Sequence, residues 1–373
     1  MKPNPPAGTA ARSGGVRPFG ADDAPAVAAL FLRTFRKSAT QPSRDLVACF
    51  REHFLAPRRA DEPSASRVFV DDAGSVSGFV GVLPARFLID GRPVEVSVAG
   101  TLMVDRPEEN PLAGARLVRA VSGPDTELTL SETANPISER LWARIGGRAI
   151  PGYSLDFLTV LRPAGLAVAL AGRALPLARA AALPARALDR FAARLVDDGL
   201  APDPHGSDVD VGPAEAAAHV FALSASRRFR PDWTVEEILH RLQEARTKAL
   251  FGDFVVRLVR DRRGAPVGLF LYHVRRDGIA QVLNILAHPG READVVARLV
   301  ADARARGAVG IKGRAEPAFT HALAARRTVF LHRASLLVHA ADATLFEPLA
   351  AGDALATGLA VENWIRLIGN ALI

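Results

Sequence analysis

The residues best suited to chemistry lie between positions 99 and 147. Here an apolar, strand-like run is followed by a proline-led turn, a helix, a second strand and the segment ANPISERLWARIGG. Pro111 is predicted to begin the helix of this stretch. A proline at the first helical position is compatible with an anion site, and it is equally compatible with an ordinary helix start. Glu132 ends the second strand, where its carboxylate could deprotonate an amine directly or through water, or could be a lone surface acid. The surrounding elements have to position these groups.

The elements predicted for the first half alternate between strands and helices. Residues 1–15 are rich in Pro, Gly and Ala and are predicted to be disordered. Asp22 and Asp23 are candidate caps for the first helix, and a second helix is predicted to begin near Pro42. The later elements are strands at 67–71, 76–89 and 93–104, a helix at 111–122, a strand at 126–131, a helix at 136–145 and a strand at 154–161.

Residues 207–342 repeat the order of the first half without obvious sequence identity to it. A short strand near Val209 precedes two helices, and the second of these starts behind the cap-like segment at Thr234. The remaining predicted elements are strands at 253–260, 267–275 and 279–287, a helix at 292–306, a strand at 308–312, a helix at 317–325 and a strand at 333–339.

Two further segments connect and complete these halves. Residues 163–206 are rich in Ala, Leu and Arg, and Leu188 and Phe191 lie on one apolar helical face. This segment is interpreted as a helical linker, with a membrane-surface helix or a lid over an acyl chain as alternatives. Residues 343–373 are so rich in apolar side chains that they are expected to dock onto the body of the protein.

The element order and the motifs within it resemble the GCN5-related N-acetyltransferase (GNAT) superfamily in a tandem, two-domain arrangement. The resemblance implies an α/β (α+β) fold with two GNAT-like domains, at residues 16–162 and 207–342, joined by the helical linker at 163–206. Each domain is expected to be a mixed, mostly antiparallel sheet flanked by helices. The implied co-substrate is acetyl-CoA or another acyl-CoA.

The resemblance also implies which residues of the first half contact the cofactor. The pyrophosphate loop of the family, Gln/Arg-x-x-Gly-x-Gly/Ala, corresponds to residues 110–115, which keep its small residues without its charge. The backbone at the end of the preceding strand would pair with the pantetheine arm. The residue at the start of the next helix would cap that helix and touch the same arm. The second-half window at 286–292 has one glycine and is not expected to hold a pyrophosphate in this way. The implied cofactor-binding residues are Leu102, Met103, Val104, Asn110, Ala113, Gly114, Ala115, Asn135 and Trp142.

The implied acid and base come from the same region. Trp142 stands where the family has a tyrosine that protonates the leaving thiolate, and an indole cannot give up a proton near neutral pH. Tyr153 is therefore the candidate acid, with unassisted thiolate release or loss of catalysis as alternatives. Glu132 is the candidate base. Further candidates for the base are His273, His288, Glu95 and the carboxylate of Ile373.

Composition limits the class of protein. The chain has 373 residues, of which 49% are hydrophobic, so it is globular and large enough for several domains. Its formal net charge of +7 comes mostly from arginine, for which a genome-wide, bacterial-type bias is favoured over nucleic-acid binding. Cys49 is the only cysteine, which excludes a disulfide framework and a thiolate metal cluster, and no metal is predicted. With no signal peptide or membrane-spanning run in the sequence, a cytoplasmic protein is expected.

The favoured function is an acyl-CoA-dependent N-acyltransferase, with acetyl as the expected acyl group. The acyl group would move to an unidentified amine by direct attack in a ternary complex, helped by orientation and a polarising backbone. One alternative is a catalytically degenerate protein of this fold that binds a ligand or partner. Another is an aminoacyl or long-chain acyl transferase of the related doubled fold. The acceptor, the acyl chain length and the oligomeric state are not readable from the sequence.

Overall fold

The computed structural model describes residues 14–38, 40–57, 62–123, 126–175, 180–195 and 206–370, and the chain divides into two compact units. Met1–Pro84 and Ala99–Asp125 form most of unit 1, and Ala85–Val98 with Thr126–Leu372 form unit 2. This division does not follow the predicted boundary at residue 162. Most of the predicted disordered tail, residues 1–13, lies outside the described residues.

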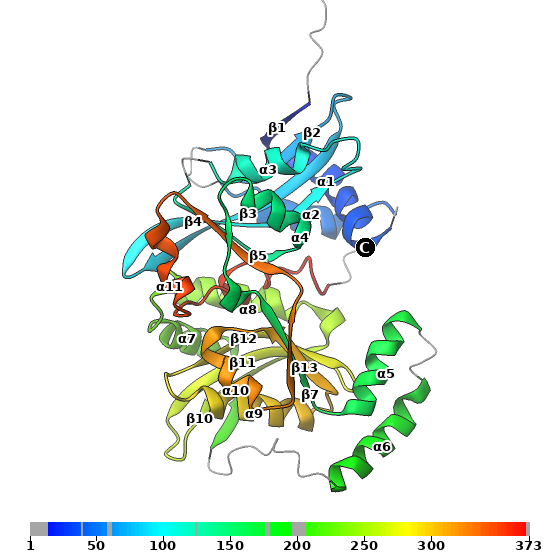
Figure 1. Cartoon of the computed structure of the whole chain (residues 1–373), viewed down its shortest axis with the longest axis vertical. Coiled ribbons are helices and arrows are strands. Elements are labelled where there is room, and N and C mark those ends of the chain that lie inside the picture. Colours follow the sequence, from blue (N-terminus) through cyan, green and yellow to red (C-terminus); the bar gives the residue numbers. More distant parts are fainter. Residues whose placement is uncertain are drawn as a thin grey trace, which may run out of the picture. The chain divides into compact units, whose positions relative to one another are not determined.

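Unit 1 is an antiparallel sheet with three α-helices (Figure 1). Its core contains edge-to-face and tilted contacts among Phe31, Phe50, Phe54 and Phe79. A side chain at Gly81 would clash with the Phe54 ring, so the strand can pass the helix closely only because this residue is glycine. The elements are β1 (Gly15–Pro18), α1 (Ala24–Phe31), α2 (Arg44–Phe54), β2 (Arg67–Val70), the first part of β3 (Val76–Ile89), the last part of β4 (Arg92–Val104) and α3 (Ala113–Val121).

The first sheet continues into unit 2, because β3 and β4 both cross the boundary between the units. Its strand order is β1-β2-β3-β4-β5-β15-β6, and β9 pairs with β3. Its single parallel pair among the described pairings is β4 with β5, matched only from Val96 with Leu128 to Val98 with Leu130. The added elements are β5 (Leu128–Ala134), α4 (Pro136–Ala143), β6 (Arg148–Ala149), β9 (Phe229–Pro231) and β15 (Ser335–Ala340).

The second sheet lies within unit 2 in the order β14-β7-β13-β12-β11-β10-β8. Its core includes Phe157, Phe270, Tyr272 and Phe319. Again one described pair is parallel, β12 with β13, matched from Ile279 with Gly310 to Gln281 with Lys312. The elements are β7 (Leu155–Val160), β8 (Ser207–Asp210), α7 (Pro213–Ser224), α8 (Val235–Arg246), β10 (Asp253–Arg260), β11 (Pro266–Val274), β12 (Ile279–Ala287), α9 (Glu292–Ala305), β13 (Gly310–Arg314), α10 (Pro317–Ala324) and β14 (Thr328–His332).

The two halves exchange strands. β7 belongs to the first half of the sequence but pairs with β13 and β14 in the second sheet. β15 comes from the second half but pairs with β5 and β6 in the first sheet. Each half therefore completes the sheet of the other, and the predicted domains at 16–162 and 207–342 follow the order of the sequence rather than the sheets. Strand pairing between distant segments leaves no local sequence signal, so this exchange could not be predicted.

The linker forms two helices, α5 (Pro163–Ala174) and α6 (Ala182–Leu195), which lie side by side (Figure 1). Asp189 of α6 accepts hydrogen bonds from the N–H groups of Ala164 and Gly165, both at 2.9 Å, and so caps α5. Leu188 and Phe191 of the predicted apolar face are exposed. Residues 196–205 of the predicted linker lie outside the described part of the chain.

The C-terminal segment packs against unit 2, to which its described residues belong. Leu349, Leu355, Leu359 and Leu367 are all buried, which agrees with the expectation that this segment docks. It forms a 3-10 turn (Ala343–Phe346), the short helix α11 (Glu347–Ala350) and a second 3-10 turn (Gly358–Ala360). Within the described ranges, every helix is too short or too polar to cross a bilayer.

Candidate functional site

The predicted pantetheine-binding residues end β4 in unit 1. Met103 is buried, whereas Leu102 and Val104 are half-buried. Thr101, immediately before them, has a φ of 54°, in the left-handed region that β-branched residues rarely adopt. Strained backbone of this kind is concentrated at functional sites. The end of β4 therefore carries a feature that sheet formation alone does not require.

The predicted pyrophosphate loop follows in the same unit. The N–H of Ala113 donates to the Asn110 carbonyl at 3.1 Å, so the helix begins at Ala113 and Pro111 lies in the preceding turn rather than at the first helical position. Ala113 and Gly114 are buried and Ala115 is half-buried. These small residues at the start of a nine-residue helix fit an anionic group in size and in backbone donors. Asn110 adds no charge to this turn.

Two other predicted cofactor residues, Asn135 and Trp142, lie in unit 2 with observed structural roles. The Asn135 side-chain oxygen accepts from the N–H groups of Ile137 at 3.0 Å and Ser138 at 2.9 Å, which caps α4. Trp142 is buried, and its carbonyl accepts from Gly147 N–H at 2.9 Å as the helix ends. A side chain on Gly147 would crowd the Trp142 ring, at 3.1 Å from its Cε3 atom.

Tyr153, the candidate acid, is fully buried. Its hydroxyl donates to the carbonyl of Ala354 and accepts from the N–H of the same residue, both at 3.0 Å. Burial raises the pKa of the phenol above its ordinary value. The Tyr153 hydroxyl thus uses both its donor and its acceptor capacity to hold the C-terminal segment. Tyr153 was expected beside a leaving thiolate, and the structure gives its hydroxyl this structural role instead.

Glu132, the candidate base, is also fully buried. It therefore lies neither at the mouth of a cleft nor on the surface, as had been expected. Its Oε1 atom accepts from the N–H of Gly358 at 3.3 Å. Burial raises the pKa of Glu132 to about 8, with Glu362 adding to the rise and Arg314 opposing it. A strand residue that looks like a surface acid in the sequence is therefore a carboxyl group that titrates near neutral pH.

Glu132 belongs to a buried cluster that also contains Glu362, Lys248 and Arg314. The Thr133 hydroxyl donates to Glu362 at 2.6 Å, and burial raises the pKa of Glu362 to about 7. Lys248 is 3% exposed and donates to the carbonyl of Asn363, and burial lowers its pKa to about 8 although three carboxylates oppose this. Arg314 donates to the carbonyl of Glu132 at 2.9 Å. Several titratable groups tuned close to pH 7 are typical of functional sites.

A cavity of about 310 Å³ lies beside this cluster within unit 2. It is called the splay cavity here, because it is lined by the residues at which the parallel pairing of β12 and β13 ends: Gln281, Val282, Leu283, Lys312, Gly313 and Arg314. Thr133, Lys248 and Asn363 also line it and connect it to the buried cluster. None of these β12 and β13 residues was predicted from the sequence to line a site, because their place in the cavity depends on where the strand pairing stops.

The C-terminal segment occupies the space further along β12. Asn284 donates to the Thr357 carbonyl at 3.1 Å and accepts from the N–H of Leu359 at 2.8 Å. Gly358 between them has a φ of 62°, and a side chain there would clash with the carbonyl of Leu283. Thr357 also donates its hydroxyl to Glu316, whose pKa burial raises to about 7. The chain itself therefore fills the part of the gap that lies beyond the splay cavity, at Asn284.

The other base candidates are dispersed. His273 lines the splay cavity, but burial lowers its pKa to about 4, so the ring is neutral at pH 7 and lies 2.9 Å from the Ala245 carbonyl. His288 is exposed in the turn before α9, and Glu95 is exposed on β4. The carboxylate of Ile373 lies outside the described residues.

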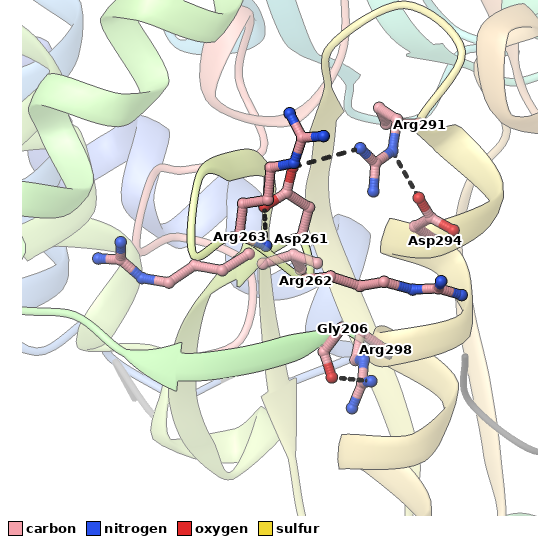
Figure 2. A pocket seen from close by; sticks show the side chains of 9 residues that line it. Gly206, Asp261, Arg262, Arg263, Arg291, Asp294 and Arg298 are labelled. Atoms are coloured by element: carbon pink, nitrogen blue, oxygen red, sulfur yellow. Dashed lines mark hydrogen bonds and ion pairs between the residues drawn. The ribbon is translucent and has the colours of Figure 1, made fainter. Parts of the chain in front are cut away.

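A second hollow, of about 240 Å³, lies between the β10–β11 turn and α9 and is rich in arginine. Figure 2 shows that Arg291 pairs with Asp294, at 2.5 Å, and that Arg298 reaches the carbonyl of Gly206. Asp261 accepts from the N–H of Arg263 in the turn at 2.8 Å. Some of its charges are therefore engaged in local pairs, and the splay cavity, which adjoins the buried titratable cluster, is the stronger candidate site.

Solved structures of three other proteins have a fold similar to that of this chain. The chain is similar to a GCN5-related N-acetyltransferase from Kribbella flavida, with 13% identity and a TM-score of 0.53 over 90% of this chain and 73% of that one. It is similar to a protein of Enterococcus faecalis V583 described as a probable N-acyltransferase, with 8% identity and a TM-score of 0.57 over 90% and 74% of the two chains. A GCN5-related N-acetyltransferase from Anabaena variabilis ATCC 29413 gives 12% identity and a TM-score of 0.56 over 88% and 73%.

No protein-family model and no curated protein sequence matches the chain. The structural likenesses nevertheless extend over about nine-tenths of it. The chain therefore has the α/β fold of the GCN5-related N-acetyltransferase superfamily, built as two mixed sheets flanked by helices. The predicted fold class is confirmed.

Proposed function

We propose that this protein is an acyl-CoA-dependent N-acyltransferase, and that acetyl is the acyl group it transfers. The observation that carries the proposal is the likeness of nearly the whole chain to solved proteins described as N-acetyltransferases or as a probable N-acyltransferase. At this level of identity the likeness establishes only the fold, and the activity is inferred from it.

The cofactor is proposed to bind to unit 1. The backbone of residues 102–104 would hold the pantetheine arm, and the N–H groups at the start of α3 would hold the pyrophosphate. Ala113, Gly114 and Ala115 fit this role because their small side chains allow close approach. The thioester supplies the acyl group, and the chain binds and orients it.

The base is proposed to be the buried carboxylate pair. The amine nitrogen attacks the thioester carbonyl carbon, the N–C bond forms, the C–S bond breaks, and the nitrogen loses a proton. A general base works best when its pKa lies near the working pH, and burial raises the pKa of Glu132 to about 8 and that of Glu362 to about 7. Within unit 2, Thr133 lines the splay cavity and donates to Glu362, so it connects this cavity to the carboxylate pair.

The test combines binding with turnover. Thermal unfolding is measured with free CoA, acetyl-CoA and palmitoyl-CoA, and products are sought by mass spectrometry with pooled amines. Binding to the folded state raises the unfolding midpoint. Gly114→Phe should abolish that rise. Gly123→Phe is the control, because a side chain at Gly123 meets open space. A CoA-induced rise that survives in Gly114→Phe would remove the proposed cofactor site.

A second candidate is a ligand-binding protein of this fold without catalysis. It is favoured by Tyr153, whose hydroxyl is fully engaged with Ala354, and by the burial of Trp142. In this case CoA raises the unfolding midpoint but no amine gains an acyl group from any acyl-CoA. Detection of one acylated product excludes this candidate.

A further inference from the structure

We infer that residues 357–363 form a proton-dependent latch. Three buried carboxyl groups, those of Glu132, Glu316 and Glu362, hold this segment against β12 most tightly while they are protonated, and the segment opens more often as they ionise. The inference concerns unit 2 alone and does not require the proposed acyl transfer. It rests on how the segment is fastened, on the charges that face the carboxyl groups and on the direction in which these groups titrate.

Each of the three carboxyl groups fastens the segment to the body of unit 2. Each accepts a hydrogen bond across this contact, and the donor in each case is neutral: the N–H of Gly358 for Glu132, the hydroxyl of Thr357 for Glu316, and the hydroxyl of Thr133 for Glu362. A neutral donor can bond to a protonated carboxyl group as well as to a carboxylate. The fastening of the segment therefore does not require these groups to be charged.

The nearby cations direct their N–H groups elsewhere. Lys248 donates to the carbonyl of Asn363, and Arg314 donates to the carbonyl of Glu132 and pairs with Asp156 at 3.2 Å. The Oε2 atom of Glu132 is buried and has no hydrogen-bond partner among the residues that the structure describes. A carboxylate buried in this way is costly, and protonation removes its charge. The closed geometry therefore suits uncharged carboxyl groups.

Charged and titratable groups from several elements face this cluster. Those near Glu132 and Glu362 are these two carboxyl groups themselves, Arg314 of β13 and Lys248 after α8, and those near Glu316 are Arg227 before β9 and Tyr153. Glu244 of α8 and the neutral His273 of β11 face Lys248 in turn, and Asp353 lies 3.8 Å from Arg227. The cations favour ionised carboxyl groups, and burial opposes them.

Burial outweighs these cations. It raises the pKa of Glu132 to about 8 and those of Glu316 and Glu362 to about 7, from an ordinary value of 4.5 that applies once the groups meet water. The closed segment therefore binds more protons than the open one. Its advantage is complete below about pH 4.5 and is lost as pH rises through 7 and 8. Burial lowers the pKa of Lys248 from 10.5 to about 8, so this group acts in the opposite sense only above about pH 8.

The residues just before the segment are held differently. Ala354 is bound through its N–H and its carbonyl to the hydroxyl of Tyr153, and burial raises the pKa of this phenol, so the contact does not change between pH 5 and 8. Opening is therefore expected to begin after this anchor. It would uncover Asn284, which bonds to Thr357 and Leu359 in the closed form, and so lengthen the splay cavity along β12.

The test is amide hydrogen exchange of the full chain, followed by mass spectrometry. Rates are compared at each pH with those of an unstructured chain, which gives a protection factor. We expect the protection factor of residues 357–363 to fall about a hundredfold or more between pH 5.5 and pH 8. At both pH values it should stay roughly tenfold or more below that of β11. A protection factor that does not change with pH would refute the latch. Equal protection of β11 and the segment would also refute it, because the segment would then open only when the whole unit unfolds.

Two variants assign the effect to the carboxyl groups. Glu132→Gln, Glu316→Gln and Glu362→Gln combined mimic the protonated form, so the change in protection factor between the two pH values should shrink to about threefold or less. Glu95→Gln combined with Glu236→Gln removes two exposed carboxylates of the same unit and should leave that change as in the wild type. If the triple variant keeps the full pH dependence, the inference is wrong. If it fails to fold, the wild-type pH profile still decides. Failure here leaves the CoA-binding test of the proposed function unaffected, because that test depends on residues of unit 1.

Discussion

The two parallel strand pairs of the molecule begin alike and end differently. β4 with β5 and β12 with β13 are each matched over three residue pairs. Beyond that point β4 passes through the left-handed Thr101 to a short turn and a helix with small residues at its start. Along β12 the corresponding space holds the C-terminal segment, bound to Asn284. A repeated fold therefore does not imply a repeated site, because a segment from elsewhere can fill one copy.

The largest expected effect comes from separating the two halves. A fragment of residues 1–162 lacks β15, and a fragment of residues 207–373 lacks β7, so each leaves two strands of its sheet without their partner. Neither fragment alone should show a cooperative thermal transition in circular dichroism, while co-expressed fragments should associate. A cooperative transition in either fragment would show that the strand exchange is not needed for folding.

Gly358→Ala tests how tightly residues 357–359 are held against β12. The substitution combines a left-handed φ of 62° with a clash against the Leu283 carbonyl, and should lower the free energy of unfolding by about 3 kcal/mol. Gly264→Ala is the matched control, because its φ is 81° but a side chain there meets open space. The control should cost about 1 kcal/mol from backbone strain alone. Equal urea midpoints for the two variants would mean that residues 357–359 are not tightly held.

Tyr153→Phe separates a structural role from a catalytic one. Loss of the hydroxyl leaves the buried N–H and carbonyl of Ala354 without this partner, and should lower the free energy of unfolding by about 2 kcal/mol. Turnover measured well below the unfolding transition should be unchanged. A large fall in kcat at unchanged stability would restore Tyr153 as the acid.

Glu132→Gln tests the buried carboxyl through pH. The pKa of Glu132 is raised from 4.5 to about 8 in the folded state, so the folded protein binds more protons than the unfolded chain between these values. Its contribution to stability is therefore fully present below about pH 4.5 and is lost as pH rises through 8. Glutamine mimics the protonated form, so the variant should match the wild type in urea unfolding at pH 5. At pH 8 it should be more stable by about 4 kcal/mol. A difference that does not change with pH would show that Glu132 does not titrate in this range.

Local sequence signals predicted most elements well. Thr234 was expected to cap a helix, and its hydroxyl accepts from Glu237 N–H while the Glu237 carboxylate accepts from Thr234 N–H. β3 and β12 were predicted with their observed bounds because apolar runs and turn residues are read over a few positions. The strands β6, β9 and β14 were not predicted, because short segments become strands only when a distant partner pairs with them.

The candidate site was less predictable than the elements. Glu132 was singled out, but its burial depends on Gly358 and Arg314, which are far from it in sequence. Lys248 gave no signal at all, because a lysine after a helix is normally solvated. Tyr153 was chosen for its chemistry, and only the fold shows that Ala354 uses its hydroxyl. The chemistry of each side chain was known from the sequence, whereas its solvent exposure and partners were not.

The sequence alone determined the order of helices and strands, the repeat of that order, and through both the superfamily fold. These depend on interactions within a few residues, which local periodicity and capping record. The tertiary structure decided that β7 and β15 change sheets, that residues 357–359 fill one gap, and that a carboxyl–ammonium cluster lies beside a cavity. Such outcomes arise from pairing and burial between segments far apart along the chain, where the free-energy difference between alternatives is not expressed in any local pattern.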